Sequence, residues 1–85
     1  MNIRTKQDLY TNLGLSPIIC KLKVIYNNND YAIWNRCLLW NEDINENNIC
    51  SGYCIYKDTI YKIQYKELAD NYFEVTHMGF INSCF

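Results

Sequence analysis

The sequence predicts an α+β fold, in which a short N-terminal helix precedes a five- or six-stranded antiparallel meander sheet or small β-barrel. Apolar residues recur at helical spacing near the N-terminus, and from Ile18 onward they alternate with polar residues at the period of a strand. Clusters of turn-forming residues divide this alternating part into short runs. The 85 residues suffice for a single domain, 1–85, with a thin core.

The helix is predicted over residues 5–13. The hydroxyl of Thr5 can accept a hydrogen bond from the amide three residues later and so cap the first turn. Leu9 and Leu13 are four residues apart and therefore share one face, and Gly14 favours the end of the helix. A helix this short is unstable alone, so we expect it to pack on the strands or to cap a barrel mouth.

The first hairpin is predicted to join a strand from Ile18 to Tyr26 with an apolar stretch from Tyr31 to Trp40, through a turn at residues 27–30. With the two central turn residues as the loop, one face is almost wholly apolar and pairs Cys20 with Cys37. On the other, mixed face the predicted pairs are Ile25 with Ala32, Lys23 with Trp34, Lys21 with Arg36, and Ile19 with Leu38. The pair of like charges is unfavourable unless it splays into solvent or binds an anion.

Three further strands are predicted, after a polar loop at residues 41–48. They are residues 49–56, 60–67 and 72–77, with residues 80–81 as a candidate sixth strand after a break at Gly79. Gly52 within the third strand indicates a bulge or a close backbone approach. In the last hairpin the predicted pairs are Tyr65 with Val75, Ile63 with His77, and Lys66 with Glu74. A helical turn over residues 66–71 is the alternative to this hairpin.

Charge and targeting signals narrow the functional classes. Eight basic and nine acidic residues give a net charge of −1, which excludes a histone-like protein or an acidic mimic of DNA as a whole molecule. The first residues lack the apolar core and cleavage site of a signal peptide, and no apolar run approaches the roughly 20 residues of a membrane span. We therefore expect a cytoplasmic protein without membrane contact.

The five cysteines and the single histidine suggest neither a metal centre nor an active site. An odd cysteine count without a signal peptide argues against a disulfide framework and favours buried free thiols. Cys50 and Cys54 would lie ~13 Å apart in a straight strand, so they could share an ion with His77 and Cys84 only after a sharp turn. Known catalytic motifs are missing, and a Cys–His dyad is the one nucleophilic arrangement left open. We expect no metal, no cofactor and no enzymatic activity.

Nucleic-acid binding by a small β-barrel is the alternative function. Lysines interleave with tyrosines in the second half of the chain, as in domains that stack bases and bind phosphates. The alternation, however, places Lys62 and Lys66 on the face opposite Tyr61 and Tyr65, and the net charge offers no long-range attraction. Nucleic acid is therefore not the expected partner.

Protein recognition is the leading hypothesis, because eight tyrosines and two tryptophans exceed what a thin core can bury. Trp34 lies on the mixed face of the first hairpin, and Trp40 precedes an acidic segment. The candidate partner-binding residues are Trp34, Arg36, Lys21, Lys23, Trp40, Glu42, Asp43 and Glu46. The alternative is that both indoles fill a second layer of a barrel or lie under the helix.

The composition carries one resemblance. Asn, Ile, Lys and Tyr number 12, 11, 6 and 8, whereas Val and Ala number two each. This bias resembles that of small proteins of mobile elements from AT-rich bacteria, including anti-CRISPR proteins and other phage-encoded inhibitors of host defence. The resemblance implies a stoichiometric inhibitor that binds a larger host protein or nucleoprotein complex, and it assigns no residues. A homodimer through a strand edge is also expected, because so small a chain gains core area by pairing.

Overall fold

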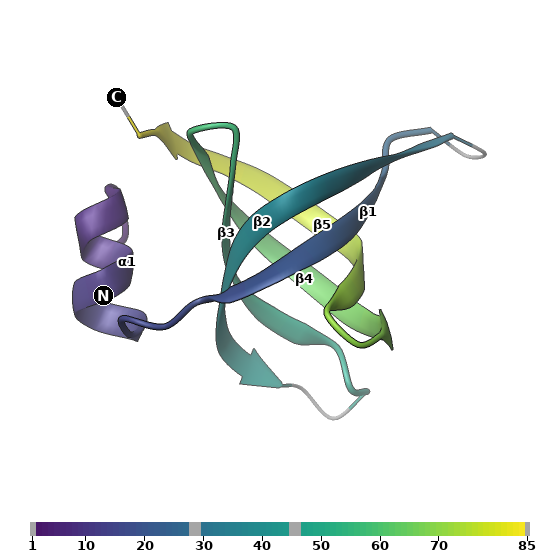
Figure 1. Ribbon diagram of the computed structural model, residues 1–85, viewed down its shortest axis with the longest axis horizontal. Helices are drawn as coiled ribbons and strands as arrows, with labels where there is room; N and C mark the ends of the chain where they lie inside the picture. Colours follow the sequence, from purple (N-terminus) through teal and green to yellow (C-terminus); the bar gives the residue numbers. More distant parts are fainter. Residues whose placement is uncertain (1, 28–29, 45–46, 85) are drawn as a thin grey trace.

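The structure, a computed structural model, describes residues 2–27, 30–44 and 47–84. In these ranges the chain forms one helix followed by five strands (Figure 1). The elements are α1 (Lys6–Leu13), β1 (Ile18–Ile25), β2 (Tyr31–Ile44), β3 (Cys50–Tyr56), β4 (Thr59–Ala69) and β5 (Tyr72–Ser83). Within the described ranges, no helix has the length and apolar character needed to cross a membrane.

The five strands form an antiparallel meander that closes into a barrel, because β5 returns beside β1. An antiparallel meander with an odd number of strands has its first and last strands pointing the same way, so this closing pair is parallel. It joins residues 21–24 of β1 to residues 72–75 of β5. The predicted fold class is confirmed, and of its alternatives the chain adopts the closed five-stranded barrel.

The predicted helix is confirmed, with Thr5 as the N-cap of α1. The Thr5 hydroxyl accepts from the Asp8 amide at 3.1 Å, and the Asp8 carboxylate accepts from the Arg4 and Thr5 amides, each at 2.9 Å. These amides lower the pKa of Asp8 below its ordinary value. Gly14 ends the helix at a φ of 129°, a conformation that only glycine adopts readily.

The interior of the barrel is an apolar core built from alternate residues of all five strands. We call the following residues the barrel core: Cys20, Leu22, Val24, Cys37, Leu39, Cys54, Ile63, Tyr65, Phe73 and Val75. A second cluster lies between the outer face of β2, β3 and β4 and the N-terminal part of the chain, which contributes Ile3 and, from α1, Leu9. Its other residues, from the strands, are Trp40, Tyr53, Ile55 and Ile60. The helix thus covers the outside of the barrel, on the side of β3 (Figure 1).

Gly52 on β3 marks the close approach that its position in the strand predicted. A Cβ atom at this residue would collide with the carbonyl oxygen of Trp40 on the neighbouring strand β2. The Trp40 peptide can take this position only because residue 52 has no side chain. The glycine therefore permits the local course of β2 next to the helix-covered tryptophan.

The first hairpin keeps its predicted register only near the open ends of its strands. Cys20 pairs with Cys37 as predicted, but Trp34 pairs with Leu22 instead of Lys23. A bulge causes the shift, and Arg36 within it has a φ of 59°. The predicted regular pairing of Lys21 with Arg36 is therefore wrong, because Lys21 lies opposite the bulge.

Three strands, β2, β4 and β5, are longer than predicted. β2 continues to Ile44, so part of the expected polar loop belongs to the sheet. In the last hairpin, Tyr65 pairs with Val75 and Lys66 with Glu74 as predicted, but a further shift places His77 opposite Gln64. Gly79 does not break β5, which runs without interruption to Ser83, and the alternative helical turn over residues 66–71 is wrong because β4 extends to Ala69.

Candidate partner-binding surface

The structure separates the two tryptophans from the charged residues that the sequence placed beside them. Trp34 faces the barrel interior with Leu22, and it packs against the edge of the barrel core. Its ring stacks on Tyr56 with centroids 4.4 Å apart and planes 7° apart, and it contacts Tyr61 at 5.1 Å. Lys21 and Lys23 lie on the opposite, outer face of the hairpin, so Trp34 does not share a surface with them.

Trp40 is buried beneath α1, with only 3% of its surface exposed. Its indole Nε1 donates a hydrogen bond to the Gly14 carbonyl at 2.9 Å, and the ring of Tyr10 meets it edge-on at 5.3 Å. Burial under the helix was the alternative interpretation of this indole. Trp40 therefore anchors the helix to the barrel and offers no area to a partner.

The acidic candidates stand apart from any exposed tryptophan. Glu42 and Asp43 are exposed near the end of β2, where the pairing with β3 shifts by one residue. Glu46 lies outside the described residues. Because Trp40 is buried, Glu42 and Asp43 have no exposed indole beside them.

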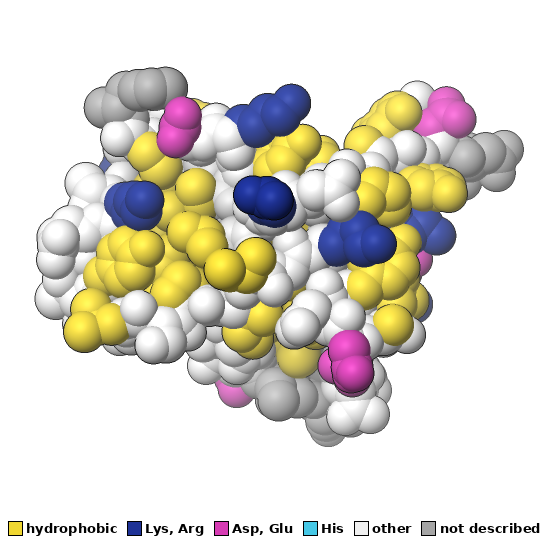
Figure 2. Space-filling view, viewed as in Figure 1, with side chains coloured by type: hydrophobic (Ala, Val, Ile, Leu, Met, Phe, Trp, Pro, Cys, Tyr) yellow, Lys and Arg dark blue, Asp and Glu magenta, His cyan; other side chains and the backbone are white. Residues whose placement is uncertain are grey.

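A different surface emerges on the outside of β1 and β2, where large apolar side chains remain uncovered. Ile19 is 67% exposed, Ile25 is 47% exposed, and Tyr31, which pairs with Ile25, is 53% exposed. The two lysines of β1 lie between these isoleucines on the same face, and Arg36 is exposed at the bulge. We call this surface the hairpin face: Ile19, Lys21, Lys23, Ile25, Tyr31 and Arg36. Figure 2, which views the molecule from the side of β1 and β2, shows apolar and basic side chains intermingled.

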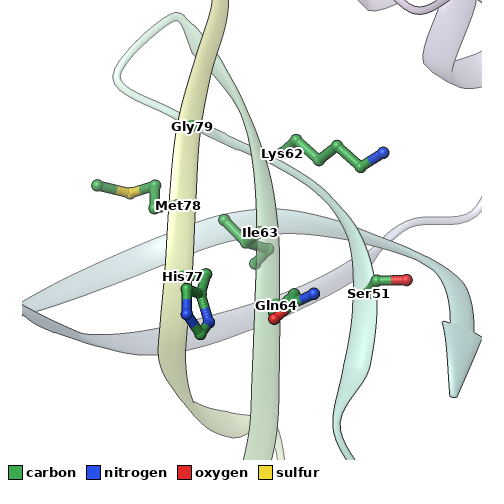
Figure 3. A pocket seen from close by; sticks show the side chains of 7 residues that line it. All are labelled: Ser51, Lys62, Ile63, Gln64, His77, Met78 and Gly79. Atoms are coloured by element: carbon green, nitrogen blue, oxygen red, sulfur yellow. The ribbon is translucent and has the colours of Figure 1, made fainter. Parts of the chain in front are cut away.

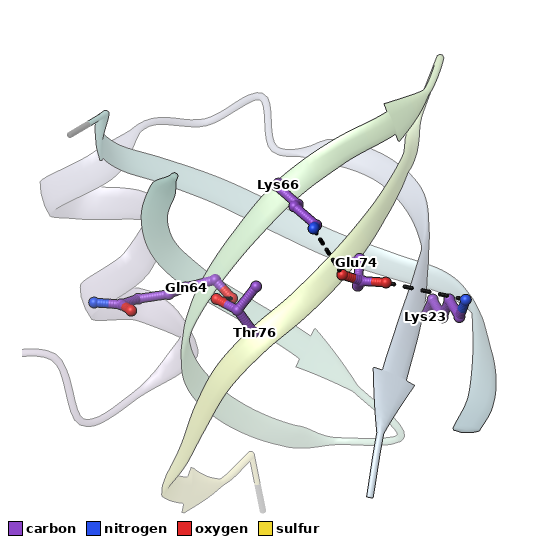
Figure 4. A network of polar contacts seen from close by, with 5 residues as sticks. All are labelled: Lys23, Gln64, Lys66, Glu74 and Thr76. Atoms are coloured by element: carbon purple, nitrogen blue, oxygen red, sulfur yellow. Dashed lines mark hydrogen bonds and ion pairs between the residues drawn. The ribbon is translucent and has the colours of Figure 1, made fainter. Parts of the chain in front are cut away.

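The basic residues of the hairpin face are held by contacts with neighbouring strands. Glu74 on β5 lies 4.0 Å from the ammonium of Lys23 and 3.2 Å from that of Lys66 (Figure 4). The Lys23 ammonium also lies 4.6 Å from the Tyr31 ring centroid, and that of Lys21 lies 5.0 Å from the Tyr72 ring centroid. These contacts orient the lysines along the surface, beside the exposed isoleucines.

Sequence reasoning found part of the hairpin face. It placed Ile19, Lys21, Lys23 and Ile25 together on one mixed face, which is where the structure places them. It assigned Tyr31 to the apolar face, because the bulge that shifts the register carries no signature in the alternation. The sequence feature that points to this surface is the presence of isoleucines on the same face as the lysines. The predicted binding site was instead centred on the neighbouring tryptophan.

Three of the five cysteines, Cys20, Cys37 and Cys54, are buried as free thiols, whereas Cys50 and Cys84 are half-buried. Burial raises the pKa of Cys20 to about 11 and that of Cys37 to about 12, and it raises the pKa of Cys54 further. All three belong to the barrel core, whereas His77 pairs with Gln64 on the outer side of the sheet and is exposed. The barrel wall thus separates His77 from these thiols. Among the described residues, no three side chains of His, Cys, Asp or Glu gather around a point where a metal ion could bind.

Comparison with known proteins found no matching family model, no similar curated protein and no similar solved structure.

Proposed function

We propose that the protein is a small stoichiometric protein-binding module, and that it binds its partner through the hairpin face. The observation that carries this proposal is the exposure of Ile19, Ile25 and Tyr31, each close to half or more uncovered, on one side of a barrel with a full core. Large apolar side chains left exposed beside charged ones are typical of protein interaction sites. Covering them is the main source of binding energy available at this surface.

The charges define the chemistry of the partner. Along β1, Lys21 and Lys23 lie between the two isoleucines, and Arg36 is exposed at the bulge. Glu74 lies beside only one of these three cations in an ion pair. The matching surface therefore carries acidic groups opposite the lysines and apolar groups opposite the isoleucines. A module of this size inhibits a larger enzyme by occupying such a surface. The compositional resemblance to anti-CRISPR proteins makes host defence enzymes the first targets to examine.

Nucleic acid is the second candidate, because lysines and tyrosines adjoin on the same surface. Two observations weigh against it. The Lys23 ammonium already lies over the Tyr31 ring, on which a base would stack, and exposed Ile19 and Ile25 contribute nothing specific to phosphate or base recognition. The experiment described next distinguishes a nucleic acid from a protein partner.

The experiment is quantitative affinity capture from a lysate of the source organism, with mass spectrometry of the retained proteins. A double variant, Ile19→Asp with Ile25→Asp, places acidic groups on the hairpin face, where they oppose an acidic partner. Leu68→Asp, at an exposed leucine of β4 outside the hairpin face, is the matched control. Circular dichroism spectra verify that all variants are folded.

We expect one protein to be retained by the wild type and by Leu68→Asp, and to fall at least about tenfold with the double variant. Equal retention by all three would refute the hairpin face as the binding site. Retention of nucleic acid alone, lost steeply between low and moderate salt, would replace the proposal with the second candidate.

A further inference from the structure

The second half of β5 has an open edge. β5 pairs with β1 only through residues 72–75, and the described pairing of residues 76–83 is with β4 alone. Figure 1 shows β5 and β1 crossing and then diverging toward opposite sides of the molecule. An unpaired edge of this kind is a template for another strand. This edge is separate from the hairpin face.

Between the two register shifts of β5, the edge carries no charged or proline residue that would prevent pairing with another strand. Between Thr76 and Cys84 the sequence has no charged residue and no proline, the two common safeguards of an edge strand. Phe80 is 68% exposed and Met78 is 45% exposed, although both pair with inward-facing residues of β4. In Figure 3, Met78 extends from β5 on the side away from β4. The barrel therefore leaves two inner-face side chains uncovered at its open edge.

The backbone groups that this edge offers follow from the register. Successive residues of an antiparallel strand direct their N–H and C=O groups alternately to the two sides. The two-residue turn between β3 and β4 makes Thr59 bond to β3, so Lys62, three residues later, bonds to β5. Its partner Gly79 therefore directs its groups to β4, whereas Met78 and Phe80 direct theirs to the open edge.

Among the described residues, neither crowding nor backbone conformation requires a glycine at position 79. A Cβ atom there would meet nothing within 4 Å, and the backbone does not adopt the left-handed conformation that requires glycine. The surface beside it is hollowed, with a volume of about 420 Å³ lined in part by His77, Met78 and Gly79. Glycine in a strand often marks the place where another backbone approaches closely.

We propose that β5 pairs antiparallel with β5 of a second copy of this chain, about a two-fold axis at Gly79. The two glycines then form the non-hydrogen-bonded pair, at which strands approach to a Cα separation of about 4.5 Å. Met78 and Phe80 of one copy hydrogen-bond through their backbones to Phe80 and Met78 of the other. Their four side chains form one apolar cluster, and no charge meets its own image across the axis.

The self-complementary pattern is the reason for choosing a second copy over an unrelated strand. A two-fold pairing places the residue on the axis directly against its own copy, so a charge at that position would face a like charge. The segment around Gly79 is uncharged, and its two exposed apolar residues flank the axis symmetrically. Both properties are requirements of self-pairing.

Charge substitutions at Gly79 test the proposal by sedimentation equilibrium. Gly79→Asp and Gly79→Lys each place like charges on the axis, in a position where the monomer has open space. We expect a wild-type dimer, a dissociation constant at least about tenfold higher for each variant alone, and restored association when the two variants are mixed. Gln64→Asp, on the adjacent strand, is the control and should associate like the wild type.

A second measurement needs no variant. Hydrogen exchange at the amides of Met78 and Phe80 should be slow at concentrations at which the wild type is dimeric, and faster after dilution. A wild type that stays monomeric at every attainable concentration would overturn the proposal. So would a dimer that tolerates Gly79→Asp, or a dimer in which these two amides exchange freely.

Discussion

Each of the three glycines of this chain has a different structural environment, and these environments determine what a side chain at each position would do. Gly14 has a positive φ, Gly52 faces a neighbouring carbonyl, and Gly79 has open space where a side chain would be. From the sequence, Gly52 and Gly79 look alike, because each interrupts an apolar strand. The two positions differ because a neighbouring strand lies against the Cβ position of Gly52 and not against that of Gly79. Where that strand lies depends on the register of the sheet.

Gly52→Ala should therefore destabilise the protein, by about 2 kcal/mol or more, because the added methyl group collides with the Trp40 carbonyl. Gly79→Ala is the matched control, and it should leave the stability unchanged or raise it by up to about 1 kcal/mol. Urea unfolding at low protein concentration measures both, so that self-association does not contribute. Equal destabilisation by the two substitutions would contradict this account of Gly52.

At the scale of the elements, the spacing of apolar residues, together with cap and turn residues, was sufficient to locate the helix and all five strands. It also gave the registers near Cys20 and Tyr65, where regular pairing prevails. The predictions failed beyond each bulge. A bulge shifts the register by one residue, and the residue that forms it has no required identity, as Arg36 with its positive φ shows.

The helix depends on its cap, because eight residues are too few to be stable without one. Thr5→Ala removes the hydroxyl that accepts from the Asp8 amide, and should cost about 1 kcal/mol of unfolding free energy. Thermal unfolding followed by tryptophan fluorescence reports on it, since Trp40 lies under α1. Thr11→Ala, on the exposed side of the same helix, is the control and should change the stability much less. Equal stability of the Thr5→Ala and Thr11→Ala variants would show that the cap does not stabilise the helix.

At the scale of the whole molecule, the candidate surface could be predicted only in part. Whether a strand residue is buried depends on which side becomes the interior and which part of the outside is covered. Trp34 entered the interior because of a bulge, and Trp40 was covered because α1 packs on the outside of the barrel. Neither fact follows from local periodicity. The isoleucines of the hairpin face were placed correctly because they lie on the regular strand β1.

The buried thiols make the stability of the barrel sensitive to alkaline pH. Folding raises the pKa of Cys20 to about 11 and that of Cys37 to about 12, from an ordinary value of 9.0. Above pH 9 the unfolded chain loses these protons while the folded chain retains them, so stability is complete below pH 9 and falls toward pH 11. Each thiol contributes a slope of at most about 1.4 kcal/mol per pH unit.

Urea unfolding across this pH range, in the presence of a reductant, measures the slope. The Cys37→Ala variant provides the comparison, because it differs from the wild type in this one ionisable group. Its stability should be lower at neutral pH, because a buried side chain is truncated, yet decline less steeply above pH 9. Parallel curves for the variant and the wild type would show that Cys37 does not titrate as proposed.

The parallel contact between β1 and β5 also has a consequence for the order of folding. Every other strand pair is a hairpin of neighbours, but Lys21 pairs with Tyr72, roughly fifty positions later along the chain. Contacts between distant positions form slowly, because the entropy of closing a long loop is lost before any interaction compensates for it. During synthesis, Leu22 and Val24 are made early, and they can pair only after Phe73 and Val75, their neighbours in the closed barrel, have been made. Until the last strand leaves the ribosome, the two margins of the sheet stay apart and the interior stays open to solvent.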